Sequence, residues 1–120
     1  MRRVLVRFPI LAYPSEYVGI GRFTAHCLNL DIIADDDSLE GALAKLLETI
    51  EQQLDAAEEN GVDPIQLAPQ RYWEMLGRAR AIPSELMERV IGTANKRQGG
   101  HGSSGAIDAD QLEIRELQTA

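Results

Sequence analysis

One long amphipathic helix, expected over residues 38–60, constrains the fold of this chain more than any other feature. Apolar side chains recur there at helical spacing and form one continuous stripe. The stripe consists of Leu39, Leu43, Leu46, Leu47, Ile50 and Leu54, with Ala42 and Ala57 on the same side. Ser38 or Asp37 can cap the start of the helix, and Gly61 can end it in a left-handed conformation. A helix with one apolar stripe is stable only against another layer, which the remaining chain must supply.

The residues before this helix have the two-residue alternation of β-strands. We expect strands over residues 4–11, 22–27 and 30–34, joined as an antiparallel meander, with a turn over residues 12–16. Pro9 cannot donate a ladder hydrogen bond, so the first strand, or at least its end, should lie at a sheet edge or a bulge. The expected fold class is α+β, with a small antiparallel sheet packed on one long helix.

Weaker signals follow the long helix. Pro69 and Pro83 can each open a short helix, and residues 98–105 form a Gly/Ser-rich linker. Residues 111–117 alternate partly like a strand, which could extend the sheet of this chain or of a neighbour, or remain a disordered tail. The expected organisation has three parts: a sheet-plus-helix core at 1–62, a short helical extension at 63–97, and a linker and tail at 98–120.

The charge balance restricts the possible partners. The chain has 19 acidic and 12 basic residues and a net charge of −7, which argues against sequence-independent binding to nucleic acid. The polar face of the long helix carries six acids against Lys45 alone, which suits a cationic protein partner, although a solvated helix face would look the same. No stretch is long and apolar enough for a secretory signal or a membrane span, so we expect a cytoplasmic protein.

Side chains with catalytic or metal-binding chemistry are few. His26 and Cys27 are adjacent on an expected strand and point to opposite faces, so they cannot form a dyad or share a metal. Cys27 is expected in the core and His26 at the surface or an interface. The acidic run of residues 35–37 could suggest a Mg²⁺ or Ca²⁺ site, but helix initiation accounts for it better. We therefore expect no catalytic residues, no metal ligands and no cofactor, and the chain is not expected to be an enzyme.

Two neighbouring segments carry a family pattern. Residues 23–34 read FTAHCLNLDIIA and residues 36–43 read DDSLEGAL, so an aromatic residue, an alanine and a C-L-x-L stretch precede a D-S helix start. This pattern resembles the HicB family of antitoxins and HicB-like proteins, and residues 69–73 resemble the end of many stand-alone HicB-like chains. The chain departs from the pattern at Asp36, where the family usually has glycine, and at Gly41, where it often has glutamate.

The resemblance implies a partial, non-catalytic RNase H-like β-β-β-α-β unit. It also implies an antitoxin-type protein that binds and neutralises a small, basic, HicA-like mRNA interferase. The candidate partner-binding residues lie on the acidic loop and helix face: Asp35, Asp36, Glu48, Glu51 and Asp55.

Two alternatives remain at this point. One is a stand-alone HicB-like homo-oligomeric adaptor without a toxin. The other is a DNA-binding autorepressor that would use residues 61–100, which hold six basic and four acidic residues, although no helix-turn-helix or ribbon-helix-helix is recognisable. Under any of these hypotheses the exposed edges of a small sheet lead us to expect a homodimer or higher homo-oligomer.

Overall fold

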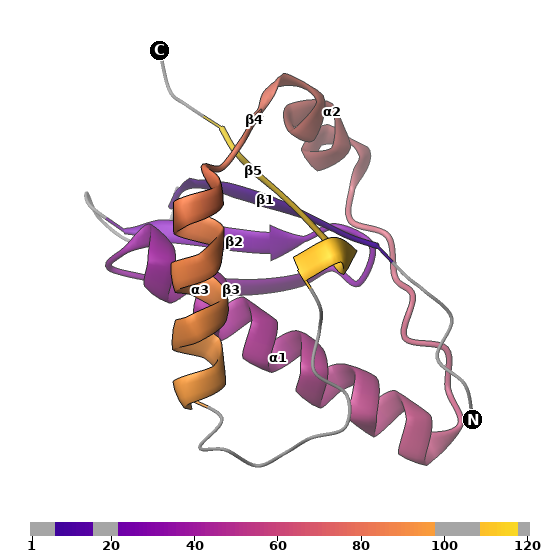
Figure 1. Cartoon of the computed structure of the whole chain (residues 1–120). Helices are drawn as coiled ribbons and strands as arrows, with labels where there is room; N and C mark the ends of the chain where they lie inside the picture. Colours follow the sequence, from indigo (N-terminus) through magenta and orange to yellow (C-terminus); the bar gives the residue numbers. More distant parts are fainter. Residues whose placement is uncertain (1–6, 16–21, 98–108, 118–120) are drawn as a thin grey trace.

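The computed structural model describes residues 7–15, 22–97 and 109–117, which form a five-stranded mixed sheet with helices on both faces (Figure 1). The strands are β1 (Phe8–Pro14), β2 (Phe23–Cys27), β3 (Ile32–Asp36), β4 (Arg80–Ala81) and β5 (Leu112–Glu116). The helices are α1 (Leu39–Asn60), α2 (Gln70–Arg78) and α3 (Ser84–Arg97), and a short 3-10 turn, η1 (Ala109–Gln111), precedes β5. The predicted α+β class is confirmed.

The strand order is β3-β2-β1-β5-β4. β1, β2 and β3 form the predicted antiparallel meander, and β4 is antiparallel to β5. β5, however, runs parallel to β1, with Phe8 opposite Leu112 and Ala12 opposite Glu116. The prediction of a purely antiparallel sheet is therefore wrong, because the chain returns to β1 through a long crossover that includes helices, as parallel neighbours require.

The position of Pro9 is also unlike the expectation. β1 is the central strand of the described sheet, with β2 on one side and β5 on the other, so it does not lie at an edge. Pro9 sits where the ladder with β2 ends: its carbonyl accepts a hydrogen bond from the Leu28 N–H (2.9 Å), and the Leu28 carbonyl accepts from the Ala68 N–H (2.8 Å). The backbone at Ala68 thus supplies the donor that a proline lacks.

Several element boundaries differ from the expected ones. β1 continues to Pro14, so the expected turn at 12–16 begins too early, and the part of the expected first strand before residue 7 lies outside the described residues. β3 begins later than expected because residues 28–31 form a turn, in which Asp31 adopts a left-handed φ of 52°.

The long helix itself agrees with its prediction. α1 is capped by the Ser38 hydroxyl, which accepts from the Gly41 N–H (2.9 Å), and it ends at Gly61 with a φ of 65°. The two short helices also begin directly after Pro69 and Pro83, as predicted.

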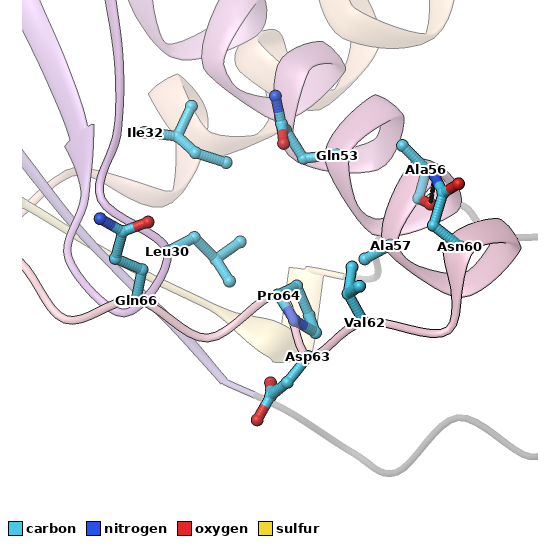
Figure 2. Close-up of a pocket in the computed structure, with 10 residues that line it drawn as sticks. All are labelled: Leu30, Ile32, Gln53, Ala56, Ala57, Asn60, Val62, Asp63, Pro64 and Gln66. Carbon is cyan, nitrogen blue, oxygen red and sulfur yellow. Dashed lines mark hydrogen bonds between the residues drawn. The ribbon is translucent and has the colours of Figure 1, made fainter.

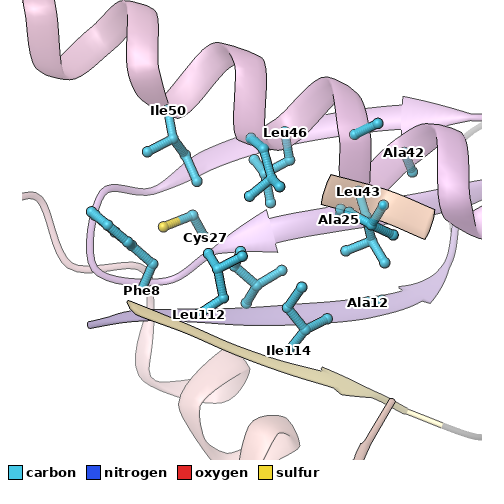
Figure 3. Close-up of a cluster of buried hydrophobic side chains, with 14 of the residues drawn as sticks. Phe8, Ala12, Ala25, Cys27, Ala42, Leu43, Leu46, Ile50, Leu112 and Ile114 are labelled. Atoms are coloured by element: carbon cyan, nitrogen blue, oxygen red, sulfur yellow. The ribbon is translucent and has the colours of Figure 1, made fainter. Parts of the chain in front are cut away.

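The main core lies between the sheet and the layer of α1 and α3 (Figure 3). It contains the predicted α1 residues and side chains from strands and helices throughout the chain: Phe8, Ile10, Ala25, Cys27, Leu43, Leu46, Leu47, Ile50, Ile82, Val90, Ala94, Leu112 and Ile114. The Glu40 carboxylate joins the two helices, since it accepts from Arg89 (3.0 Å) and Thr93 (3.2 Å). Residues from all three expected segments thus share one hydrophobic core.

The opposite face of the sheet is covered by α2. Tyr72, Trp73 and Leu76 pack against Leu11 and Tyr13 of β1 and against Leu28. His26 of β2 is directed to this face and is only 1% exposed, so the prediction of a surface or interface histidine is wrong. His26 is buried because α2 covers this face of the sheet. The first third of the chain alone would leave the face exposed to solvent. Cys27 points to the main core, as predicted.

Candidate functional site

The acidic run at the end of β3 is engaged within the chain. The Asp35 carboxylate accepts from the Thr24 hydroxyl, and the Asp36 carboxylate forms an ion pair with Lys45 at 2.9 Å. Lys45 also donates to the Asp35 carbonyl (3.2 Å). The hydrogen bond and charge of Lys45 lower the pKa of Asp36. These contacts hold the end of β3 against the first turns of α1, so two of the five predicted partner-binding residues have a role inside the fold.

Asp36 and Gly41 lie against each other at the start of α1. A Cβ atom on residue 41 would overlap the Asp36 carboxylate and would stand 2.9 Å from the Ser38 hydroxyl oxygen. Gly41 therefore leaves the space that the Asp36 side chain occupies at the start of α1.

The other three predicted residues lie along α1 and differ in exposure. Asp55 is exposed and Glu48 is half-buried, but Glu51 is only 8% exposed. The prediction that Glu51 faces solvent is wrong. It follows Leu47 by four residues and Ile50 by one, so it borders the apolar stripe and is carried toward the buried side of the helix.

The C-terminal half of α1 and the segment after it remain strongly acidic. Between Lys45 and Arg71 the sequence contains no basic residue and six acids, which are Glu48, Glu51, Asp55, Glu58, Glu59 and Asp63. Of these, Asp55, Glu58, Glu59 and Asp63 are exposed. We refer to these four residues as the acidic end of α1.

Beside the acidic end of α1 lies a cavity of about 270 Å³, which we call the α1 groove (Figure 2). It is bounded by the β2–β3 connection, by α1 and by the segment that follows α1: Leu30, Ile32, Gln53, Ala56, Ala57, Asn60, Val62, Asp63, Pro64 and Gln66. The hydrogen bond from the Gln66 N–H to the Asn29 carbonyl (3.0 Å) holds this segment against the β2–β3 turn. Sequence reasoning missed the groove, because its walls come from three separated segments without a shared periodicity.

A buried polar cluster lies on the other face of the sheet. The His26 Nε2 atom is 2.8 Å from Asp31 Oδ1, and the Tyr72 ring meets the imidazole edge-on at 4.7 Å. His26 is almost fully buried, so a substrate has no access to the imidazole, and the pair instead holds the β2–β3 turn against α2.

The buried Cys27 thiol is not suited to act as a nucleophile either. Burial raises the pKa of its thiol to about 12, so the nucleophilic thiolate is disfavoured. Within residues 7–15, 22–97 and 109–117, no three His, Cys, Asp or Glu side chains are grouped so that they could hold a metal ion.

Comparison with protein-family models, curated proteins and solved structures gives no match. Of the helices in the described part of the chain, none combines the length and apolar character needed to cross a membrane. The geometry thus offers one candidate binding surface, formed by the acidic end of α1 and the α1 groove.

Proposed function

We propose that this chain is a HicB-like antitoxin-type protein that binds and neutralises a small, basic, HicA-like mRNA interferase in the cytoplasm. The observation that carries the proposal is the acidic end of α1, in a stretch of sequence without a basic residue. An enzyme that binds RNA needs cationic side chains on its RNA-facing surface. An acidic surface complementary to them would occupy that surface and exclude the RNA.

We propose further that the strands and α1 form a non-catalytic, RNase H-like fold. A partial RNase H-like β-β-β-α-β unit is supported by the meander β1–β2–β3, by α1 after it, and by β5 parallel to β1. Its non-catalytic character is supported by β1, which contains no carboxylate, since two-metal nuclease chemistry needs acidic side chains that converge on the ions.

The direct test is inhibition of RNA cleavage. A toxin-sized protein encoded beside the gene is purified, and its cleavage of an RNA substrate is followed as this chain is added. Cleavage should stop at a fixed stoichiometric ratio. Undiminished cleavage with the chain in excess would refute the proposal.

The electrostatic part of the proposal has its own test. Association should slow as salt rises, because the Debye length falls from about 10 Å at 0.1 M to about 3 Å at 1 M. Asp55→Lys should slow association at low salt, whereas Glu74→Lys, the same type of change at an exposed position of α2, should not. Equal rates for the two variants would show that the acidic end of α1 is only solvated surface.

A stand-alone homo-oligomeric adaptor is a second candidate, and the edge strand β3 favours it. Ile33 on this strand is 51% exposed, and an edge strand leaves backbone groups open to pairing. Light scattering tests whether β3 mediates the assembly that the adaptor requires: a dimer that Ile33→Lys converts to a monomer would support it, and the RNA-cleavage assay decides between the two candidates. A wild-type mass that stays monomeric over a wide range of concentration would refute the adaptor.

A further inference from the structure

We infer that the α1 groove receives one apolar side chain of the basic partner, while neighbouring Lys or Arg side chains of that partner contact Glu59 and Asp63. The inference rests on the proposed function, because it places the docking of the same partner on this chain.

The groove is small, and apolar side chains form two of its sides. Pockets for cofactors and drug-sized ligands usually measure about 300–1,000 Å³, and the α1 groove, at about 270 Å³, lies below that range. Figure 2 shows Leu30 and Ile32 on one side of the space and Ala57 and Val62 on the other. Asp63 is the one charged residue of the lining, and its Oδ1 accepts from the Ile65 N–H (2.9 Å).

The segment that follows α1 exposes several large hydrophobic side chains, of which Val62 lines the groove. Among the described residues, three of the four large exposed hydrophobic side chains lie in the segment that forms one wall of the groove or continues from it. These are Val62 at 58%, Ile65 at 47% and Leu67 at 66% exposure. Such a concentration of exposed apolar side chains in one short segment is compatible with a protein interaction site.

The charge beside the α1 groove determines which kind of partner segment can bind there. Asp63 lines the groove, and Glu59 directly precedes the lining residue Asn60 on α1. An apolar side chain flanked by acids would be repelled, whereas the same side chain flanked by Lys or Arg gains complementary contacts. Asp63 therefore favours a basic partner, and the apolar side chains of Leu30, Ile32 and Val62 offer a position for one anchor residue.

The first test fills the groove from the helix. Ala56 is exposed and lines the groove, so Ala56→Phe should occupy the space without disturbing the core. Gln52→Phe adds the same ring at an exposed position of α1 outside the groove and serves as the matched control. We expect Ala56→Phe to weaken binding of the toxin by about tenfold or more, as at other interface anchors, and Gln52→Phe to leave it unchanged. If the toxin binds all three proteins equally, the groove is not the docking site, although the proposed function stands.

A second test does not need the toxin. The labelled peptide Lys-Lys-Leu-Phe-Lys-Lys is titrated into the ¹⁵N-labelled chain, with Lys-Lys-Ser-Ser-Lys-Lys as the probe without an apolar anchor. The first peptide should shift the amide signals of residues 53–66, and Ala56→Phe should abolish these shifts. Their absence, or equal shifts with the second peptide, would overturn the inference. So would a wild-type dimer that Ala56→Phe converts to a monomer, since the occupant would then be a second copy.

Discussion

Replacement of Ile114 by alanine tests whether β5 is a necessary part of the core. Ile114 is 3% exposed, lies in the main cluster, and its carbonyl accepts from the Ile82 N–H (3.1 Å). Ile33→Ala is the matched control, because it makes the same chemical change in another strand at a residue that is 51% exposed. The apparent β-propensity of a residue reflects its packing and burial at each site, so the difference between the two variants reports burial and packing.

The expected magnitudes follow from these exposures. Removing a buried isoleucine side chain to alanine costs about 2–5 kcal/mol, which includes the cavity that remains. At Ile33 about half of the side chain is already in solvent, so only part of the roughly 1.5–3 kcal/mol transfer term is lost and no cavity forms. A domain of this size has about 5–15 kcal/mol of total stability, so Ile114→Ala should remove a large share of it.

Urea unfolding followed by circular dichroism at 222 nm measures both variants. The unfolding midpoint of Ile114→Ala should fall well below that of Ile33→Ala, with similar slopes in urea. The values should be the same at two protein concentrations, which separates packing within the chain from self-association. If the two variants lose the same free energy of unfolding, β5 does not pack on the core as described.

Three further predictions concern single residues. Because burial raises the pKa of Cys27 to about 12, iodoacetamide at pH 8 should label the native protein only as fast as it unfolds; rapid labelling without urea would contradict the buried position. Gly92→Ala, in open space on α3, should stabilise by about 0.5–1 kcal/mol, whereas Gly41→Ala should give no gain because its Cβ overlaps the Asp36 carboxylate; equal gains in urea midpoints would argue against this overlap. Lys45→Met should cost at most about 1 kcal/mol at neutral pH. Since Lys45 lowers the pKa of Asp36 below its usual 3.8, the ion-pair part of this cost should persist above that pH and be lost as the pH falls through the folded-state value. Only the part that comes from the bond to the Asp35 carbonyl should remain, and a cost that is constant down to pH 2 would contradict the ion pair.

The features that sequence analysis predicts well are those with local causes. The period of the apolar stripe, the Ser38 cap and the left-handed Gly61 together define α1 without reference to the rest of the chain. The meander is likewise set by alternation and short connections. In contrast, the direction and neighbour of β5 depend on a pairing between Phe8 and Leu112, for which no local pattern exists.

The candidate site is less predictable for the same reason. The sequence shows that the second half of α1 is acidic, and Asp55 is exposed as expected. It does not show that Asp36 is held by Lys45, because this contact depends on how β3 meets α1. The position of Glu51 at the border of the apolar stripe, in contrast, follows from the helical period. His26 is misjudged because α2, which buries it, comes from a region with weak periodicity.

The pairing of β1 with β5 has a consequence for synthesis on the ribosome. β1 is made first, but one of its two long edges stays open until residues 112–116 have been translated. At about 5–20 residues per second, that interval lasts roughly 5–20 s. During this time the strand that becomes the centre of the sheet is itself an edge strand, able to pair with another nascent chain. A message cut within the coding region of α3 would leave a product in this state permanently, and such a product should aggregate or be degraded rather than accumulate as a shortened folded protein.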